Sequence, residues 1–273
     1  MESLTVIKVG GAVVEDEASL KCLLDQFAAF EGKKVLVHGG GRSATRMAAS
    51  LGIESVMIGG RRVTDAETLK VVTMVYAGLV NKNIVAQLQA RGVNALGLTG
   101  ADVDVIRSHK RPLKEVVTDD GSTRMVDFGF VGDVDRVDDV VLSSLVETLT
   151  RGGRNGAVVM SPLTHDGQGN LLNTNADTIA SETARALAKH YDVTLTFCFE
   201  KPGVMSDPDD DDSVIPQISL SSYQTLKEQG VVSGGMLPKL DNAFEAIRQG
   251  VGRVIITHFS DIVCESGTVI VEE

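Results

Sequence analysis

One lysine lies inside a run of apolar residues that otherwise predicts a buried strand. Lys8 belongs to the segment LTVIKV at 4–9 and shares a strand face with Leu4 and Val6. Lysine is seldom buried without a partner. The ammonium group can extend from the strand end into water, or it can lie over a bound phosphate. The sequence leaves both possibilities open.

Glycine clusters follow the first two predicted strands. Gly10 and Gly11 come directly after the strand at 4–9, and the run HGGG at 38–41 follows a strand at 34–37. Glycine lets backbone N–H groups approach an anion closely, and ligands of open α/β sheets bind beyond the carboxyl ends of strands. Two such clusters at consecutive strand ends favour a phosphate site.

The second cluster also fits another class of protein. Residues 39–44 (GGGRSA) match G-x-G-x-x-A, the fingerprint of dinucleotide-binding proteins, so an NAD-dependent oxidoreductase is an alternative. The dinucleotide-binding alternative is weakened, because this fingerprint follows the second strand and leaves the glycine pair at 10–11 unexplained. HGGG further resembles the oxyanion loop of esterases, but an esterase of that type is excluded because the chain has no G-x-S-x-G nucleophile elbow. The chain also has no Walker A loop, the phosphate-binding motif of P-loop proteins.

Polar and charged groups elsewhere in the chain complete the candidate chemistry. The segment NTNAD at 173–177 precedes a predicted helix, so its asparagines can cap that helix or bind a carboxylate and an acyl amide. Lys239 lies in the first turn of another predicted helix, where a cation opposes the helix dipole unless an anion is bound. Arg61 and Arg62 can each grip a carboxylate through two hydrogen bonds.

Alternating strand and helix patterns must position these groups. Short apolar runs predict strands at 4–9, 34–37, 94–98, 156–160, 192–199, 253–257 and 268–271. Helical spacing is found at 17–30, after the HGGG run to about 51, at 65–91 (broken or bent near Gly78), at 139–151, from about 176, and at 219–229 and 237–249. Hairpin signals at 119–122, within a β-rich insert at 103–132, and at 165–167 interrupt the alternation. This order predicts an α/β fold with a mainly parallel, doubly wound sheet.

Composition narrows the class of protein. The net charge of −11 without a basic tract makes nucleic acid and anionic membranes poor partners. No uninterrupted apolar run reaches the roughly 18–20 residues of a membrane span, and the first residues do not resemble a signal peptide, so we expect a cytoplasmic protein. Cys22, Cys198 and Cys264 are expected to be free thiols, and no residue spacing favours a metal site.

Taken together, these segments resemble the amino-acid-kinase superfamily and, within it, the N-acetylglutamate kinases. The matching segments are KVGG at 8–11, HGGG at 38–41, GGRRVTDAETLKVV at 59–72, AGLVNKNIVAQL at 77–88, LLNTNADTIA at 171–180 and GGMLPKL at 234–240. The resemblance implies a three-layer αβα sandwich forming one domain over 1–273. Within it, an N-terminal lobe (about 1–172) would bind the acyl-amino acid, and a C-terminal lobe (about 173–273) would bind ATP.

The activity that the resemblance implies is ATP-dependent phosphorylation of the γ-carboxylate of N-acetyl-L-glutamate, the second step of arginine biosynthesis. Mg²⁺ would arrive on ATP, and the protein would be a homodimer built through the long helix near 65–78. Because the insert at 99–132 covers the acyl-group region and has unusual residues, N-succinylglutamate is an alternative substrate. Another acidic amino acid, or a non-catalytic sensor of nucleotide or amino acid, also remains open.

The resemblance also implies roles for single residues. The catalytic set is Lys8, Lys239 and Asp177, with the two lysines neutralising the transferring phosphoryl group and the aspartate organising both. The nucleotide set is Lys8, Gly10, Gly11 and Lys239, and the substrate set is Gly40, Gly41, Arg62 and Asn173. The chain departs from the family pattern at 199–203 (FEKPG), where members commonly have an aspartate. This is the loop at which the resemblance implies contacts with the adenine nucleotide.

Overall fold

The computed structural model describes residues 1–117, 123–207, 209–232, 236–263 and 266–272. Three features expected from the sequence lie outside these ranges. They are the hairpin turn at 119–122, the glycines that precede Met236, and Cys264.

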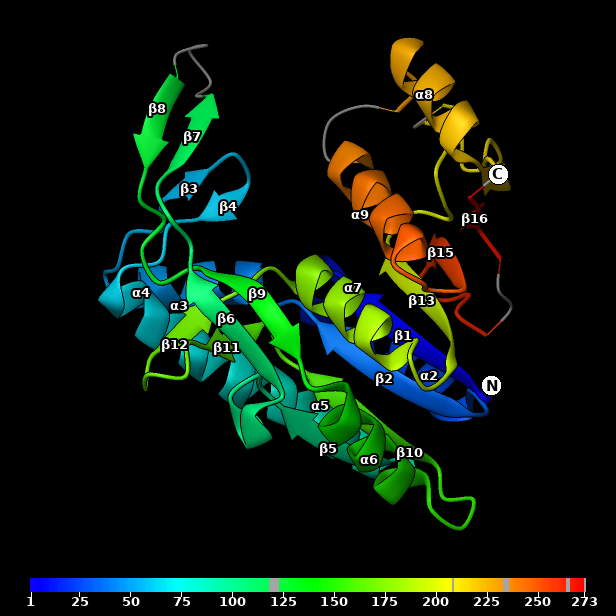
Figure 1. Ribbon diagram of the computed structural model, residues 1–273, viewed down its shortest axis with the longest axis horizontal. Helices are drawn as coiled ribbons and strands as arrows, with labels where there is room; N and C mark the ends of the chain where they lie inside the picture. Colours follow the sequence, from blue (N-terminus) through cyan, green and yellow to red (C-terminus); the bar gives the residue numbers. More distant parts are fainter. Residues whose placement is uncertain (118–122, 208, 233–235, 264–265, 273) are drawn as a thin grey trace.

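One eight-stranded sheet runs through the centre of the molecule, in the order β14-β16-β15-β13-β1-β2-β10-β5 (Figure 1). Its strands are β1 (Ser3–Val9), β2 (Lys33–His38), β5 (Asn94–Leu98), β10 (Gly156–Met160), β13 (Asp192–Phe199), β14 (Gln217–Ile218), β15 (Arg253–His258) and β16 (Thr268–Ile270). All neighbours pair in parallel except β15 and β16, which are antiparallel. The mainly parallel sheet predicted from the sequence is therefore confirmed.

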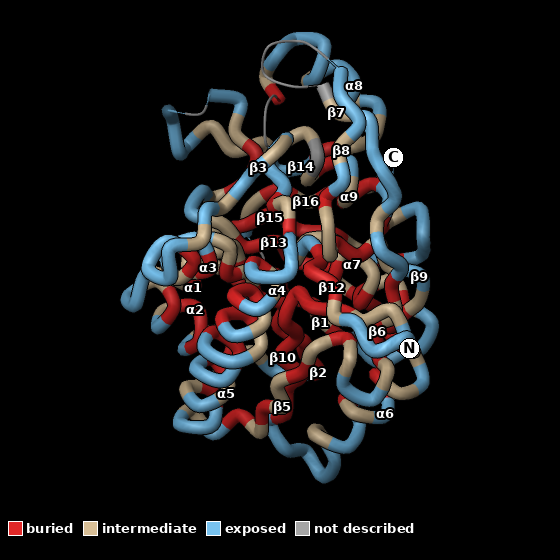
Figure 2. The backbone as a smooth tube through the Cα atoms, turned by 90° about the vertical axis from the view of Figure 1, so that its left-hand side faces the viewer, coloured by how far each residue is buried: buried red, intermediate tan, exposed pale blue. Residues whose placement is uncertain are grey.

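Helices cover both faces of this sheet. One face carries α6 (Asp139–Thr150), α7 (Ala176–Leu187), α8 (Leu220–Glu228) and α9 (Met236–Arg248). The other carries α1 (Gly11–Glu15), α2 (Glu17–Ala29), α3 (Gly41–Ser50), α4 (Ala66–Val72) and α5 (Asn81–Gln89). Successive residues of a strand point to opposite faces, so Leu4 and Val6 join one buried cluster while Ile7 and Val9 join the other. Figure 2 shows this buried interior along the central strands, and the three-layer αβα sandwich is confirmed.

A π-helical segment, η1 (Thr73–Val80), joins α4 to α5 without a break. In place of the break or bend expected near Gly78, the structure has a local widening within one continuous helix over 66–89. By length and composition this helix could cross a membrane. Core helices of globular proteins pass the same test, and Val75, Ile84 and Leu88 of this helix are buried in the core.

Smaller β structures stand beside the main sheet at one end (Figure 1). A four-stranded sheet has the order β12-β11-β6-β9, formed by β6 (Ile106–Lys110), β9 (Gly132–Val137), β11 (Leu163–His165) and β12 (Leu171–Asn173). Two antiparallel pairs are β3 (Met57–Ile58) with β4 (Arg61–Arg62) and β7 (Lys114–Val117) with β8 (Thr123–Val126). The strand pairs flanking both predicted hairpin turns are confirmed, whereas β3, β4 and β14 were not expected.

Candidate active site

The two glycine loops pack backbone to backbone at the carboxyl ends of β1 and β2. The N–H of Gly39 donates to the carbonyl of Val9 over 3.2 Å. A Cβ atom added to Gly11 would lie 3.7 Å from the backbone nitrogen of Gly40 and 3.8 Å from that of Gly41. Because the first N–H groups of a helix have no intrahelical partner, the start of α3 at Gly41 leaves donors available for an anion.

A side chain at Gly40 would be tightly packed against a neighbouring aromatic ring. A Cβ atom at this position would come within 3.0 Å of Cδ1 and 3.2 Å of Cε1 of the Tyr76 ring. Tyr76 is buried in η1, and burial raises the pKa of its hydroxyl while the nearby Arg62 guanidinium lowers it. The π-helical segment therefore sets the position of the second glycine loop.

A buried histidine holds the same loop from the other side. Nδ1 of His38 lies 2.8 Å from the carbonyl oxygen of Gly39, and Nε2 lies 3.2 Å from the amide nitrogen of Asn81. That amide nitrogen also donates to the carbonyl of Val159 over 3.1 Å. Burial lowers the pKa of His38 to about 4, so the ring is neutral at pH 7. Nδ1–H therefore donates to Gly39, and Nε2 accepts from Asn81.

Lys8 reaches the side of the sheet covered by α7 and forms an ion pair there. Its Nζ lies 2.7 Å from Oδ1 of Asp177, and only 9% of the lysine side chain is exposed. Asp177 is in the first turn of α7, where a carboxylate suits the helix dipole. The side chain of Asn175 caps this helix by accepting from the N–H groups of Asp177 and Thr178. The capping role considered for this asparagine is confirmed.

Lys239 approaches Lys8 across one aromatic ring. Its Nζ lies 3.6 Å from the centroid of Phe199, and Nζ of Lys8 lies 5.5 Å from the same centroid. Burial lowers the pKa of Lys239 and the positive charge of Lys8 lowers it further, while Asp177 and Glu200 raise it. Two ammonium groups from distant parts of the chain thus converge, and a bound anion would remove the repulsion between them.

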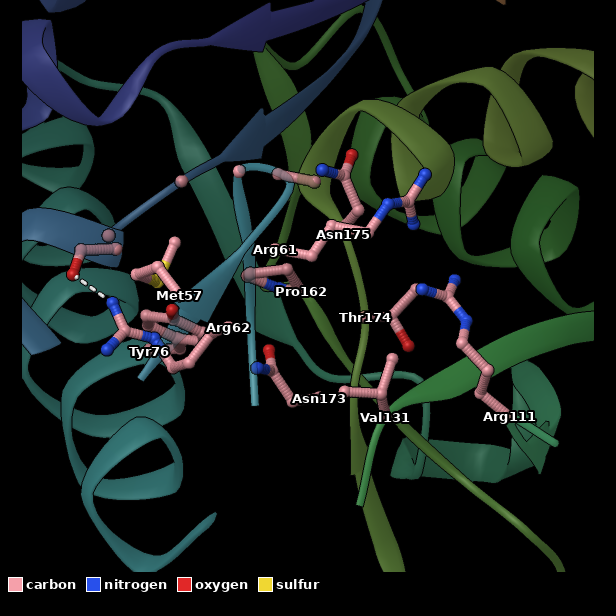
Figure 3. Close-up of a pocket in the computed structure, with 15 residues that line it drawn as sticks. Met57, Arg61, Arg62, Tyr76, Arg111, Val131, Pro162, Asn173, Thr174 and Asn175 are labelled. Atoms are coloured by element: carbon pink, nitrogen blue, oxygen red, sulfur yellow. Dashed lines mark hydrogen bonds between the residues drawn. The ribbon is translucent and has the colours of Figure 1, made fainter. Parts of the chain in front are cut away.

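Both lysines line a cavity of about 350 Å³ together with the first glycine pair. A second cavity, of about 200 Å³, is shown in Figure 3. Residues 39–41 line both cavities. The four residues of the expected substrate set, Gly40, Gly41, Arg62 and Asn173, line the second one. The two cavities are therefore adjacent, with the second glycine loop in the wall of both.

Arg62 is fixed in the wall of the second cavity. Its Nη2 donates to the carbonyl of Gly41 and to Oγ1 of Thr45, each over 2.8 Å, and its Nη1 donates to Oγ of Ser55 over 2.9 Å. Figure 3 shows the bond to Gly41. Asn173 follows on β12, where its amide nitrogen donates to Thr64. These bonds leave the arginine charge without a carboxylate partner among the residues described here.

Several residues of these cavities were not identified from the sequence. Tyr76, Phe199 and Arg111 line them, and His38 supports the loop that separates them. Their residue types gave no signal, because isolated aromatic, histidine and arginine residues are common in any core or surface. Only His38, directly before three glycines, had a position that could have suggested a supporting role.

Comparisons with known proteins agree with this architecture. Residues 3–258 match the model of the amino acid kinase family. The chain is 64% identical over 268 residues to acetylglutamate kinase of Bacteroides fragilis, covering 98% of this chain and 96% of the relative. It is 50% identical over 263 residues to acetylglutamate kinase of Cytophaga hutchinsonii, covering 96% and 94%.

Solved structures show the same fold. A protein of Streptococcus mutans superposes with a TM-score of 0.74 at 25% identity, covering 99% of both chains. Carbamate kinase of Giardia lamblia gives a TM-score of 0.64 at 16% identity, covering 100% of this chain and 99% of the other. The sequence and structural matches span nearly the whole chain, and the chain belongs to the amino acid kinase family.

Proposed function

We propose that this chain is an enzyme that transfers the γ-phosphoryl group of ATP to the γ-carboxylate of N-acetyl-L-glutamate, a step of arginine biosynthesis. The observation that carries the proposal is the convergence of Lys8 and Lys239 beside a cavity that shares its glycine wall with a second, arginine-lined cavity. The names of the relatives in Bacteroides and Cytophaga support the same substrate.

In this proposal the larger cavity holds the phosphates of ATP and the smaller one holds the acyl-amino acid. Lys8, Lys239 and the N–H group of Gly11 contact the nucleotide phosphates, while Gly10, whose N–H donates to the carbonyl of Cys198, lines the same cavity. The α-carboxylate of the substrate lies against Arg62 and Asn173, which places the γ-carboxylate at the glycine loop 39–41. The segments before and after about residue 172 then act as the acyl-amino-acid lobe and the nucleotide lobe of one domain.

The reaction requires no general base. A glutamate γ-carboxylate has an unperturbed pKa of about 4.3 and is ionised at pH 7. One of its oxygens attacks the γ-phosphorus while the bond to the β,γ-bridging oxygen breaks, and the electron pair leaves on ADP. The products are ADP and a carboxyl–phosphoryl anhydride. Positioning and charge stabilisation are the contributions left to the protein.

Electrostatic repulsion is the main obstacle, because both reactants are anions. Two unit charges about 4 Å apart repel by about 4 kcal/mol at an effective dielectric constant near 20. Lys8 and Lys239 offset this repulsion from the nucleotide side. Asp177 holds Lys8 in place through the 2.7 Å ion pair, so that the ammonium group is fixed before the phosphoryl group arrives.

A magnesium ion carried by ATP completes the charge balance in this proposal. Among the described residues, no group of three or more His, Cys, Asp or Glu side chains could hold a metal ion. When bound, the magnesium ion would neutralise β- and γ-phosphate oxygens, and Lys8 and Lys239 would neutralise the remainder.

The proposed assembly is a homodimer in the cytoplasm. Met74 and Leu79, in the helix over 66–89, are 53% and 59% exposed. Apolar side chains of this size are suited to pack against a second copy of the same helix. Light scattering should give the mass of a dimer for the native chain, and Met74→Lys with Leu79→Lys should give a monomer. A native chain that is monomeric at micromolar concentration would contradict this part.

Trapping with hydroxylamine tests the proposed reaction directly. The chain is incubated with ATP and Mg²⁺ and with N-acetyl-L-glutamate, L-glutamate or L-aspartate, and the acyl phosphate is measured as the hydroxamate. We expect product with the acylated substrate only. Binding of ATP and N-acetylglutamate without hydroxamate would instead identify a non-catalytic sensor, and the proposal would be wrong.

A further inference from the structure

Lys239 lies over an aromatic ring, whereas Lys8 in the same cavity pairs with a carboxylate. The Nζ atom of Lys239 is 3.6 Å from the centroid of the Phe199 ring. Among the described residues it forms no ion pair, and Asp177 and Glu200 act on it only through their charge. A cation within about 6 Å of a ring centroid is attracted by the negative face of the ring. The contact with Phe199 is therefore a direct attraction that acts on this ammonium group.

The ring of Phe199 has a defined place in the wall of the cavity. Phe199 ends β13, and its carbonyl accepts from the N–H of Phe259 over 3.0 Å. The ring stacks on that of Phe197, with the planes 5° apart and the centroids 6.5 Å apart. A Cβ atom added to Gly10 would lie 4.0 Å from Cδ1 of the Phe199 ring. The strand end, a second ring and the first glycine loop thus hold this ring in position.

The two lysines are held by different groups. Nζ of Lys8 lies 2.7 Å from Oδ1 of Asp177 and 5.5 Å from the centroid of the Phe199 ring. Lys239 comes from α9 and approaches the same centroid more closely, without an ion pair to any described residue. The position of Lys239 therefore depends on the ring more than the position of Lys8 does.

A ring suits this place better than a carboxylate would. A carboxylate paired with Lys239 would cancel a positive charge that offsets the charge of the phosphoryl group. A ring face attracts a cation through its quadrupole and carries no net charge, so the charge of the cavity is kept. Burial and the positive charge of Lys8 lower the pKa of Lys239, and the ring face opposes this by stabilising the charged form.

We propose that Phe199 is a positioning residue for phosphoryl transfer, whose ring face holds the ammonium group of Lys239 beside that of Lys8. This inference rests on the proposed function and adds a residue to its machinery. Phe199 acts through Lys239 and does not contact the reacting atoms. Holding a long, flexible side chain in place before the nucleotide arrives lowers the entropic cost of the reaction.

Fluorination of the ring tests this role with little change in its size. Each fluorine atom withdraws electrons and weakens the attraction of the ring face for a cation. Phe199 is replaced by mono-, di- and trifluorinated phenylalanine, and kcat is measured as hydroxamate formation from ATP and N-acetyl-L-glutamate. We expect log kcat to fall with each added fluorine, to a loss of roughly 3- to 30-fold for the trifluorinated ring. KM for ATP should change less.

Phe27 provides the matched control. Its buried ring contacts the ammonium group of Lys34 at 5.1 Å, but it lines neither of the two cavities. The same fluorinated series at Phe27 should leave kcat unchanged. Phe199→Tyr keeps the ring face and should remain close to the native rate, whereas Phe199→Leu should lose as much as the trifluorinated ring. The fluorinated series decides the matter even if Phe199→Leu does not fold.

A titration followed by NMR tests the contact without turnover. Isotope-labelled lysine reports the pKa of each ammonium group, and the signal of Lys239 is assigned by its loss in Lys239→Arg. Because the ring face favours the charged form, the pKa of Lys239 should fall along the Phe199 series. The charges of Lys8, Asp177 and Glu200 are the same in every member of the series, so they do not produce the trend.

The outcomes separate this inference from the proposed function. Native turnover with equal rates along the Phe199 series, or with equal losses at Phe199 and Phe27, overturns the inference and leaves the proposed function standing. A pKa of Lys239 that does not change along the series also overturns it. A native chain that forms no hydroxamate contradicts the proposed function, and the role of Phe199 in phosphoryl transfer falls with it.

Discussion

Lys8 of the first strand and Asp177 of α7 form a 2.7 Å ion pair at the point where a second lysine, Lys239, approaches the same aromatic ring. Asp177 pairs directly with Lys8, whereas the carboxylates of Asp177 and Glu200 act on Lys239 only through their charge. Lys239 forms no ion pair among the described residues, so its charge is available for an anion. Because the ion pair with Asp177 involves Lys8 and not Lys239, the two lysines can be tested by separate substitutions.

Replacing either lysine should slow turnover strongly. Lys8→Ala or Lys239→Ala removes one preorganised positive charge from the transferring phosphoryl group, and we expect kcat to fall by roughly 10²–10³-fold. Lys21→Ala is the matched control, because Lys21 is exposed and pairs only with Asp25 on the surface of α2. Steady-state release of ADP measures the effect. Near-normal turnover in a lysine variant would remove that residue from the mechanism.

Arg62→Ala should chiefly weaken binding of the acyl-amino acid. The variant loses the guanidinium in the wall of the second cavity, whereas the larger cavity does not include this residue. We expect KM for the acylglutamate to rise by about 10-fold or more, with a smaller change for ATP. Because Arg62 also supports the carbonyl of Gly41, Arg62→Lys serves as a comparison that keeps the charge. A raised KM for ATP alone would contradict the assignment.

Gly40→Ala should disturb the loop between the two cavities. The added methyl group would meet the Tyr76 ring at 3.0 Å, so either the ring or the loop must move. Overpacking of this kind typically costs about 1–3 kcal/mol of folding free energy. Gly78→Ala is the control, since no atom lies within 4 Å of its added Cβ. Urea denaturation should show destabilisation for Gly40→Ala only. Equal stability of the two variants would show that the loop is not tightly packed.

His38 should make stability depend on pH. Burial lowers its pKa to about 4 in the folded chain, against about 6.5 when unfolded. As the pH falls below about 6.5 the unfolded chain binds the proton first, so the folded state loses stability until the pH reaches about 4. The free energy of unfolding should therefore be about 2 kcal/mol lower at pH 5 than at pH 7.5.

The variant His38→Gln isolates this effect because it cannot bind the proton. Its free energy of unfolding, measured in urea at both pH values, should decline less than that of the native chain. His109→Gln changes an exposed histidine and should follow the native chain. Parallel declines for the native chain and His38→Gln would mean that His38 is not buried in its neutral form.

The sequence alone determined most of the longer strands and helices, but not the short strands β3, β4 and β14. Apolar runs such as 156–160 and the helical spacing of 139–151 are local patterns, and burial of one face is enough to select the element. Gly10, Gly11 and the run at 38–41 could be placed at strand ends for the same reason. The alternation of elements then selected a mainly parallel sheet, since parallel strands need crossover connections.

Only the tertiary structure decided which of these groups meet. The order of the eight strands puts β1 beside β13, and this brings Phe199 next to Lys8. No local pattern specifies that order, because strand pairing depends on contacts between residues far apart in the chain. The packing of Tyr76 against Gly40 arises in the same way. Residue types and spacing could therefore nominate the chemical groups, while their convergence required the packed sheet.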